Sequence, residues 1–487
     1  MIRPRTKQTK EHVITDDIEG WATAADILMS SFFIGGGKYP EYEGRKVHFS
    51  YHKIRDKNAP ISGGFLAPGP EPLMYCLNMI ERLLTRIAED GILKPIHVYD
   101  ICMFIADAVL SGGVRRSATI CLFSLDDEEM LKSKTGNWMQ ENPQRARSNN
   151  SVVILRDSMT LEQLTEMAQW IRQFGEPGIV LVSSLEHCFN PCVEIGFYPV
   201  LVDADGTTES GFQGCNLCEI NGNQCNTKEE FFEACRIASI LGTLQAGYTH
   251  FKFVSETTRK IFEREALLGV SLTGWMNNPD ILFDPATLEE GARIVKETNR
   301  KVAKLIGINP AARTTCVKPS GNASVLLQSA SGIHAEHAPR YIRNIQMNKF
   351  QEVGNIIKKN FPYMVEESIW STGKTDYVIS FPVIAPKQSL FKKDMNAIQF
   401  LEYVKIVQKH WVMAGNDASN AIDPTVNNNV SNTVLVGENE WEDVMKFIFQ
   451  NKGYYTGISL LSKSGDKDYY QAPFIEVLTP EEKIGRA

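Results

Sequence analysis

The stretch from Thr160 to Val182 constrains the fold more than any other part of the sequence, because it marks both ends of a helix and the strand that follows. Thr160 and Gln163 have the spacing of a capping box, and apolar residues then recur on one helical face. Gly175-Glu-Pro-Gly should end this helix, and Ile179–Val182 has the composition of a buried strand. A helix joined so closely to a buried strand is typical of α/β proteins.

The same pattern recurs further along the chain. Thr227 and Thr287 each stand three residues before a glutamate, and they open two more predicted helices, one through Leu241 and one ending near Gly307. Helices and short apolar strands alternate without an internal repeat. We therefore expect an α/β fold.

Composition and charge exclude several classes of protein. The 487 residues are 43% hydrophobic and 22% charged, as in ordinary globular proteins. The net charge is −7 and no basic run follows the first ten residues, so we expect no duplex nucleic acid as a partner. The most apolar window, Ile27–Ile34, is too short to span a bilayer, so we expect no membrane contact. The ten cysteines should stay reduced in a cytoplasmic protein.

One cysteine lies between an amide and a carboxylate, in Asn190-Pro-Cys-Val-Glu194. If this segment is extended, Asn190, Cys192 and Glu194 project into one cavity, because alternate side chains of a strand face the same side. Glu194 can accept a proton, and Cys192 can yield a thiolate or a thiyl radical. Cys215, 23 residues later, could supply reducing equivalents. For the pentapeptide alone, a structural turn with a buried cysteine is the alternative.

The same region permits a different interpretation, in which four cysteines bind zinc. Cys188 with Cys192, and Cys215 with Cys218, have spacings near those of zinc ribbons. However, Phe189 and an Asn-Pro step follow Cys188, where a glycine-rich knuckle would be expected. We therefore favour a reactive thiol and expect no metal site.

Three loops of small and polar residues could contact an anionic ligand. Thr315–Ser324 could present backbone N–H groups and hydroxyls to a phosphate, with an ordinary turn as the alternative. Ser111–Ala118 contains two adjacent arginines, for which we favour a structural salt bridge over substrate contact. Ser62–Pro70 contains two glycines and could line a pocket.

Several motifs together resemble a known family. They are Gly112-Gly-Val-Arg-Arg-Ser-Ala118, Asn190-Pro-Cys-x-Glu194, Cys215-Asn-Leu217 and Val317-Lys-Pro-Ser-Gly321. In this order they resemble the large chain of a ribonucleotide reductase, and in detail the adenosylcobalamin-dependent class II enzymes of the monomeric ribonucleoside-triphosphate reductase type. Weaker similarities run from Glu19-Gly-Trp21 to Gln471-Ala-Pro473. The alternative is a class I-type large-subunit chain that uses a separate radical-generating subunit.

The resemblance implies a fold, a reaction and residue roles. We expect a ten-stranded α/β barrel of the ribonucleotide reductase type, of which this chain supplies the larger C-terminal part. The reaction would be radical reduction of ribonucleotides to 2′-deoxyribonucleotides, with adenosylcobalamin as cofactor. Cys192 would become the thiyl radical, Glu194 would take the 3′-hydroxyl proton, and Asn190 would hold the hydroxyls. Cys215 would belong to the dithiol that is oxidised.

The resemblance also implies a ribonucleoside di- or triphosphate substrate and a thioredoxin-like reductant. The residues expected to contact the substrate are Ser320, Gly321, Asn322, Ala323, Ser324, Ser62 and Gly63. We expect residues 1–487 to form a single catalytic barrel unit, with residues from about 355 to 487 as a C-terminal elaboration.

The sequence departs from the family pattern at several places. Val193 stands where a glycine is usual, Asn322 stands where a threonine is usual, and Asp203–Gly206 is expected to form an inserted hairpin turn. No cysteine precedes Cys76. The resemblance then implies that the chain is either a fragment or one chain of a split enzyme. We favour the split, in which a companion polypeptide carries the family's first redox cysteine, the N-terminal barrel segment and the effector region.

Overall fold

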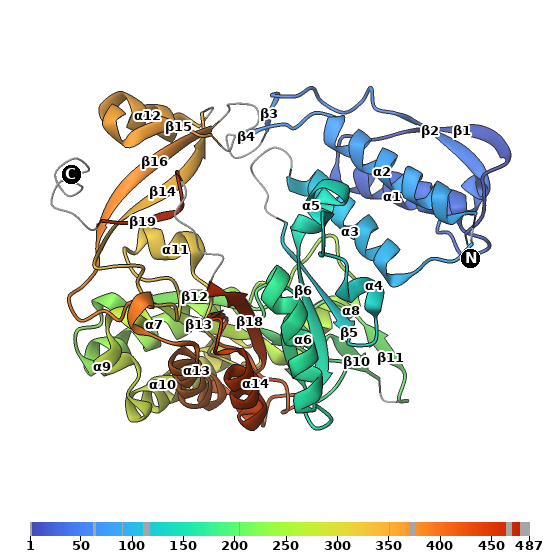
Figure 1. Ribbon diagram of the computed structural model, residues 1–487. Helices are drawn as coiled ribbons and strands as arrows, with labels where there is room; N and C mark the ends of the chain where they lie inside the picture. Colours follow the sequence, from blue (N-terminus) through green and yellow to red (C-terminus); the bar gives the residue numbers. More distant parts are fainter. Residues whose placement is uncertain are drawn as a thin grey trace. The chain divides into compact units, whose positions relative to one another are not determined.

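The computed structural model describes residues 2–61, 65–89, 91–110, 117–203, 205–349, 351–369, 376–463 and 470–477. The chain divides into two compact units, Met1–Val152 and Val153–Ala487. Helices and strands alternate in each unit, so the predicted α/β class is confirmed (Figure 1). Among the described residues, no helix combines the length and the apolar composition needed to cross a membrane.

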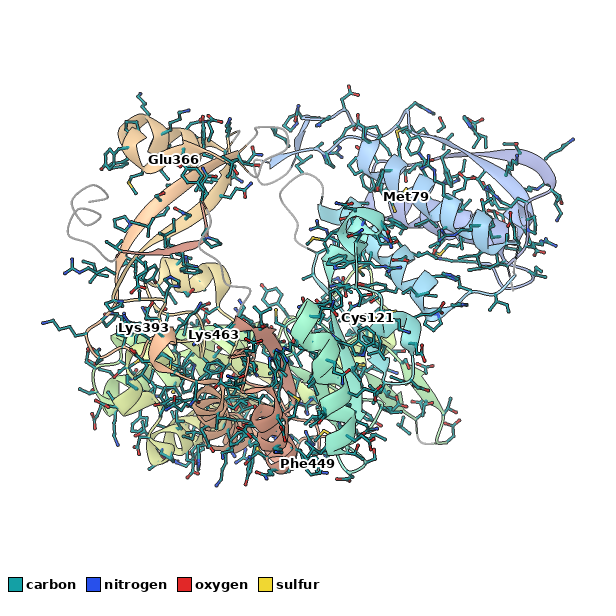
Figure 2. The ribbon with its side chains drawn as sticks, in the orientation of Figure 1. Met79, Cys121, Glu366, Lys393, Phe449 and Lys463 are labelled. Carbon is teal, nitrogen blue, oxygen red and sulfur yellow. The ribbon has the colours of Figure 1, made fainter. Side chains whose placement is uncertain are left out.

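The first unit buries its core between three helices. Its elements are β1 (Lys7–Val13), α1 (Ile18–Phe32), β2 (Arg45–Ser50), β3 (Pro60–Ile61), β4 (Phe65–Leu66), α2 (Glu71–Ile87), α3 (Pro95–Leu110), β5 (Thr119–Ser124), α4 (Glu128–Leu131), α5 (Trp138–Glu141) and β6 (Ser148–Leu155), in which the second unit begins. The apolar faces of α1, α2 and α3 meet in this core, and Met79 of α2 packs against it (Figure 2).

The second unit contains every predicted site residue except Ser62 and Gly63. Its first elements are α6 (Leu161–Phe174), β7 (Gly178–Val182), β8 (Cys188–Phe189), β9 (Gly196–Phe197), β10 (Val200–Val202), β11 (Thr208–Ser210), β12 (Asn216–Asn221), α7 (Lys228–Ala246), α8 (Glu256–Glu265), β13 (Leu268–Thr273), α9 (Pro279–Leu282) and α10 (Pro285–Ile306). The later elements are α11 (Gly321–Leu326), β14 (Arg340–Asn348), α12 (Glu352–Asn360), β15 (Val365–Glu367), β16 (Asp376–Ile384), α13 (Ala397–Val407), β17 (Thr433–Val436), α14 (Trp441–Gln450), β18 (Gly457–Ser462) and β19 (Phe474–Glu476).

Parallel strands form the framework of the second unit. β12 pairs in parallel with β13, and α7 and α8 supply the long crossover that such a pair needs. β13 bridges to the segment 313–317 at Thr315, and that segment bridges to Val430 through Val317. β17 pairs in parallel with β18, which pairs antiparallel with β7. Segments that are distant in sequence are thereby brought side by side.

Helix α7 packs on β12 and β13, and α10 packs on α7 (Figure 1). A methyl group at Gly242 of α7 would lie 3.2 Å from Leu268 Cγ, so the helix packs closely on β13. Between the helices, Asn299 Nδ2 donates to Thr243 Oγ1 at 2.9 Å. Both side chains are buried, and the bond satisfies polar groups that would otherwise be costly in a helix interface.

The predicted helix signals of α6 and α7 are confirmed. Thr160 Oγ1 accepts from Gln163 N at 3.2 Å, and Gly175 ends α6 in the left-handed conformation, with φ 72°. Thr227 caps α7 as predicted, although the helix continues beyond Leu241 to Ala246. The predicted hairpin near Asp203 is also present, because β10 and β11 pair antiparallel.

The predicted start of α10 is wrong. Asp284, and not Thr287, is the N-cap, because Asp284 Oδ2 accepts from Thr287 N at 3.2 Å. Pro285 follows at the first helical position. An aspartate N-cap with proline directly after it is the stronger start signal. The end of the helix at Gly307 is as predicted.

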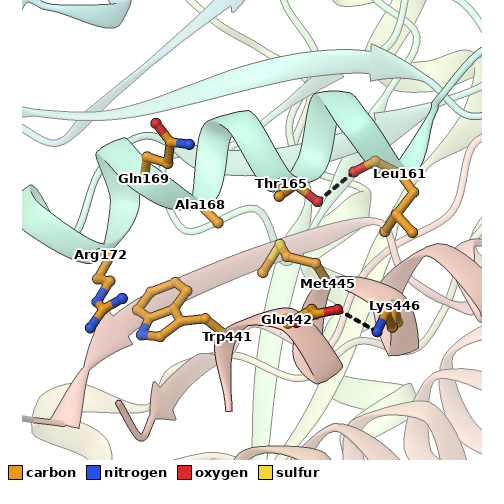
Figure 3. Close-up of a pocket in the computed structure, with 9 residues that line it drawn as sticks. All are labelled: Leu161, Thr165, Ala168, Gln169, Arg172, Trp441, Glu442, Met445 and Lys446. Atoms are coloured by element: carbon orange, nitrogen blue, oxygen red, sulfur yellow. Dashed lines mark hydrogen bonds and ion pairs between the residues drawn. The ribbon is translucent and has the colours of Figure 1, made fainter. Parts of the chain in front are cut away.

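Two further features of the second unit contain none of the predicted site residues. β15, β16, β14 and β19 form a four-stranded antiparallel sheet in that order. A groove of about 340 Å³ lies between α6 and α14, with Ala168, Trp441 and Met445 on its apolar side and Arg172 at its edge (Figure 3). None of the residues predicted for the site lines this groove.

Candidate active site

Cys192 lies at the tip of a short hairpin. β8 and β9 pair antiparallel, and residues 190–195 form the tip. Asn190 O accepts from Val193 N at 2.8 Å, which closes a turn. The segment is therefore not extended, and the directions of its side chains do not follow strand alternation. Cys192 is exposed, whereas Glu194 is only 2% exposed.

Val193 has an uncommon backbone conformation in this turn. Its φ is 61°, in the left-handed region that β-branched residues rarely adopt. The side chain packs against β18, because a methyl group at Gly457 would lie 2.6 Å from Val193 Cγ1. Contact with the neighbouring strand therefore holds the tip in a conformation that its own sequence disfavours.

The polar segment that contains Asn429 and Ser431, which is distant in the sequence, hydrogen-bonds to the tip at Cys192 and at Glu194. Ser431 Oγ donates to Cys192 O at 2.8 Å. Asn429 N donates to Glu194 O at 3.0 Å. The backbone positions of the thiol and of the carboxyl are thereby fixed by neighbouring residues of a single segment.

A π-helical turn holds this polar segment in place by hydrogen bonds. Gln408 begins the turn, which continues α13. Its Nε2 donates to Asn428 O at 2.9 Å, and its Oε1 accepts from Val430 N at 3.0 Å. Asn428 Oδ1 accepts from Gly196 N at 3.0 Å, at the base of the hairpin. π-Helical turns are rare and are frequent at functional sites.

The environment of Glu194 favours its protonated form. Its Oε2 has no hydrogen-bond partner among the described residues. Burial raises the pKa of the Glu194 carboxyl, and the Asn190 amide and the Lys318 ammonium oppose that rise. Cys192 is exposed as a residue, but partial burial of its thiol, together with the charge of Glu194, raises the pKa of that thiol. Cys192 therefore keeps its S–H bond at neutral pH, beside a carboxyl that binds protons more readily than usual.

Cys215 lies beside the base of the same hairpin, directly before β12. A methyl group at Gly269 of β13 would lie 3.0 Å from Cys215 Sγ and 2.9 Å from Ile195 Cδ1, so both side chains lie over this glycine. Burial raises the pKa of the Cys215 thiol well above its ordinary value, Glu194 adds to the rise, and Arg313 opposes it.

A buried ion pair links the two cysteine segments. The side chains of Arg313 and Glu265 are 1% and 0% exposed, and Arg313 Nη1 lies 3.3 Å from Glu265 Oε1. Arg313 Nε donates to Gly196 O in the hairpin at 3.2 Å. Glu265 Oε2 accepts from Gln213 Nε2 at 2.6 Å, two residues before Cys215. Burial would raise the pKa of Glu265, but its partners, Arg313 first, hold it below the ordinary value.

The predicted phosphate loop forms the start of α11. Ser320 is the N-cap, with φ 62°, and its buried Oγ has no partner among the described residues. Ser324 Oγ donates to Gly321 O at 2.9 Å, inside the helix. Ala323 is half-buried in the first turn. The side chain of Asn322 and the whole of Ser62 and Gly63 lie outside the described residues, so their predicted contacts with the substrate stay predictions.

Two charged residues of the site were not singled out from the sequence. Glu219 of β12 stands opposite Ser271 of β13 in the strand register. Lys318 N donates to Ser271 Oγ at 2.8 Å, so Glu219 and Lys318 flank this serine from either side. One signal could have identified Glu219, because it is four residues after Cys215 in a strand and thus shares its face.

The geometry does not support the alternative zinc site. Cys218 faces α7, where it lies 3.5 Å from the Cβ position of Gly242, on the face of β12 opposite to Cys215. Within the described ranges, no group of three or more His, Cys, Asp or Glu side chains could hold a metal ion. All ten cysteines are free thiols.

Comparisons with known proteins point to one group of enzymes, although no protein-family model matches the chain. A probable adenosylcobalamin-dependent ribonucleoside-triphosphate reductase of Dictyostelium discoideum is 26% identical over 492 residues, which are 96% of this chain and 59% of that protein. Adenosylcobalamin-dependent ribonucleoside-triphosphate reductases of Lactobacillus acidophilus and Levilactobacillus brevis are 28% identical over 417 residues and 27% identical over 512 residues. These matches cover 76% and 94% of this chain, and 53% and 63% of the relatives' lengths.

A solved structure defines the fold. The crystal structure of a B12-dependent (class II) ribonucleotide reductase superposes with a TM-score of 0.78 at 20% identity, over 98% of this chain and 67% of that one. The chain therefore has the α/β barrel fold of the class II ribonucleotide reductases, as predicted. It spans little more than half the length of the first curated relatives that it matches.

Proposed function

We propose that the chain catalyses radical reduction of ribonucleotides to 2′-deoxyribonucleotides as part of an adenosylcobalamin-dependent reductase. The observation that carries the proposal is the exposed thiol of Cys192 beside the buried carboxyl of Glu194, with Cys215 at the base of the same hairpin. The names of the relatives, which match most of the chain, support a ribonucleoside triphosphate as substrate.

Three residues of the hairpin have different roles at the ribose of the substrate. Cys192, as a thiyl radical, removes the 3′-hydrogen, and its position at an exposed tip lets it meet the substrate. Glu194 takes the 3′-hydroxyl proton, and its raised pKa makes it a stronger base than an exposed carboxylate. Asn190 Oδ1 accepts from Ile195 N at 3.0 Å, which leaves the amide NH₂ to orient Glu194 and the substrate hydroxyls.

Cys215 is one of two thiols that reduce the 2′ position. The 2′-hydroxyl leaves as water, and the two thiols lose two electrons and become a disulfide, which a thioredoxin-like protein reduces. We place the second thiol on a companion polypeptide. In support, β12 pairs only with β13 among the described strands, which leaves its other edge open to a further strand directly after Cys215.

The cofactor would lie beside the exposed thiol of Cys192. The residues there fit a polar ligand, because the buried Asn432 Oδ1 has no partner among the described residues while its Nδ2 donates to Gly457 O at 2.9 Å. When bound, adenosylcobalamin would supply the radical chemistry that removes the hydrogen atom from the Cys192 S–H group. Ser431 fixes the Cys192 backbone, and burial keeps water from Glu194.

The substrate phosphates would bind at the start of α11. The hydroxyl of Ser320 is unpaired among the described residues, and the first N–H groups of a helix point out of it. Ser324 has a different role, because its N–H donates to Ser320 O at 2.8 Å and its hydroxyl donates to Gly321 O. It shapes the turn that Ser320, Gly321, Asn322 and Ala323 present.

The substitution Cys192→Ala tests this function. In the enzyme assembled with its companion polypeptide, ribonucleotide reduction should fall to background while thermal unfolding is unchanged, because the side chain is exposed. Cys188→Ala, which removes a thiol from β8 of the same hairpin, is the matched control and should keep its turnover. Reduction by the Cys192→Ala enzyme would overturn the proposal. A turnover that needs no adenosylcobalamin would favour the class I-type alternative.

A further inference from the structure

The site contains a charged cluster for which the proposed radical chemistry has no role. Glu219 stands opposite Ser271 in the strand register, and Ser271 Oγ accepts from Lys318 N at 2.8 Å. Ser320 follows two residues after Lys318. The charge of Lys318 and the hydroxyl of Ser320 both act on the Glu219 carboxyl, so a carboxyl, an ammonium and a hydroxyl group are gathered where β12, β13 and the start of α11 meet.

The polar atoms of this cluster are buried without partners outside the cluster. Among the described residues, the Glu219 carboxyl and the Ser320 hydroxyl have no hydrogen-bond partner besides each other. Glu194 Oε2, at the hairpin, has no hydrogen-bond partner among the described residues either. Buried polar atoms in folded proteins are nearly always fully paired, so a site whose carboxyl and hydroxyl oxygens lack partners outside the cluster has room for a polar ligand.

The charges of the cluster are unbalanced before any ligand arrives. Two carboxyl groups, Glu194 and Glu219, face one ammonium, Lys318. Burial raises the pKa of Glu219, the charge of Glu194 adds to the rise, and Ser320 and Lys318 oppose it. Cys316 also faces these carboxyls, but burial raises its pKa well above the ordinary value and it stays neutral.

An incoming phosphate would change this balance in a definite direction. A phosphate at Ser320 brings negative charge next to Glu219 and competes with it for the ammonium of Lys318. Like charges in a site of low polarity disfavour the ionised form of a carboxyl. A protonated carboxyl can instead donate a hydrogen bond to a phosphate oxygen.

We propose that Glu219 takes up one proton when the phosphates of the substrate bind beside Ser320. The proton comes from the solvent, an O–H bond forms on the Glu219 carboxylate, and no bond of the substrate breaks. Lys318 becomes the counter-ion of the phosphate. This inference rests on the proposed function only for the position of the phosphates, and not on the reductase activity.

Calorimetry with inorganic pyrophosphate tests the inference on the full chain. Titrations in two buffers of different ionisation enthalpy give the number of protons taken up per pyrophosphate bound. The wild-type chain should take up as much as one proton beyond the Glu219→Gln chain. Its affinity should weaken with rising pH by as much as about tenfold per pH unit relative to that variant, since one proton is linked to binding. The ionisation of pyrophosphate itself is common to both chains.

Two further variants assign the proton. Glu229→Gln, at an exposed position near the start of α7, should behave as the wild type. Glu194→Gln should retain most of the uptake. Loss of uptake in Glu194→Gln with full uptake in Glu219→Gln would overturn the inference, because the proton would then belong to Glu194.

Two other outcomes are measured on the wild-type chain alone, so they do not depend on whether a variant folds. Binding without proton uptake, or no binding of pyrophosphate, would each overturn the inference. Uptake that depends on Glu219, together with full turnover of the assembled Cys192→Ala enzyme, would separate the two proposals. The proposed radical function would then fail while the role of Glu219 stands.

Discussion

At the scale of single residues, the tip of the hairpin is a compromise between backbone conformation and packing. A non-glycine residue in the left-handed region costs about 1–2 kcal/mol, and Val193 bears this cost at φ 61°. Its Cγ1 fills the space above Gly457, where no larger residue fits. The shape of the tip thus depends on a pair of residues that are far apart in the sequence.

Substitutions test the contact between Val193 and Gly457. Gly457→Ala should lower the free energy of unfolding by about 1–3 kcal/mol, because its methyl group would overlap Val193 Cγ1. Adding Val193→Gly should restore most of that loss. Urea unfolding of the single and double variants measures the coupling. Gly453→Ala is the control, because no heavy atom lies within 4 Å of its Cβ position. Additive effects of the two substitutions would contradict the contact.

The ion pair of Arg313 and Glu265 should set the reactivity of Cys215. Arg313→Met removes the cation that lowers the pKa of the thiol, so alkylation by iodoacetamide should slow at a given pH. Glu265→Gln leaves that cation uncompensated, so alkylation should become faster. Mass spectrometry of Cys215 over a range of pH measures both effects. A general loosening of the site would instead speed alkylation in both variants.

At the scale of elements, α10 depends on a cap that joins it to α7. Asp284 accepts from Thr287 N and also pairs with Lys228 at the start of α7, at 2.8 Å. Asp284→Ala should lower the free energy of unfolding by about 1 kcal/mol, as for other N-caps. Chemical denaturation measures the loss, and Thr287→Ala should cost less because the cap itself remains.

The pH dependence of this cap has a definite sign. Lys228 first, and Thr287 next, lower the pKa of Asp284 to about 2. Because the folded-state pKa lies below the ordinary value near 4, the contribution is present above that value and is lost as the pH falls through about 2. The difference between the wild type and Asp284→Ala should therefore stay constant from neutral pH to about pH 4 and shrink below it.

Elements with local signals could be predicted from the sequence, and elements held by distant partners could not. The capping box of Thr160 and the left-handed Gly175 specify α6 within its own residues. The turn at Cys192 depends instead on Ser431, which is 239 residues away, and on Gly457 in β18. The turn could not be predicted, because nothing in the sequence around Cys192 indicates its contacts with Ser431 and Gly457.

The residues of the candidate site likewise include some that the sequence predicts and some that it does not. Cys192, Glu194, Cys215 and the loop at Ser320 were found because motifs keep their order along a chain. The charged residues that surround them act through partners on other strands. Arg313 meets Glu265 only in the folded chain, so the spacing of these two residues carries no signal. The distance of Glu219 from Cys215 does carry one, but its proximity to Lys318 across β13 does not follow from the sequence.

At the scale of the whole molecule, the relatives contain more chain than this sequence matches. The Dictyostelium discoideum protein is matched over 59% of its length. β12 has β13 on one side and no other partner among the described strands. An open strand edge readily accepts another strand. If the second thiol of the proposed reaction lies on another polypeptide, a strand of that polypeptide would pair with this edge, next to Cys215.

Amide hydrogen exchange tests this docking with a control inside the same strand. Asn216 N donates to Leu267 O, and parallel ladders alternate, so the N–H groups of Asn216, Cys218 and Ile220 face β13. Those of Leu217, Glu219 and Asn221 face the open edge. Binding of the companion should slow exchange of the second set and leave the first set nearly unchanged, as measured by mass spectrometry with residue-level fragmentation. If the companion bound without slowing the second set, it would not add a strand at β12, and the second thiol would have to approach Cys215 from another side.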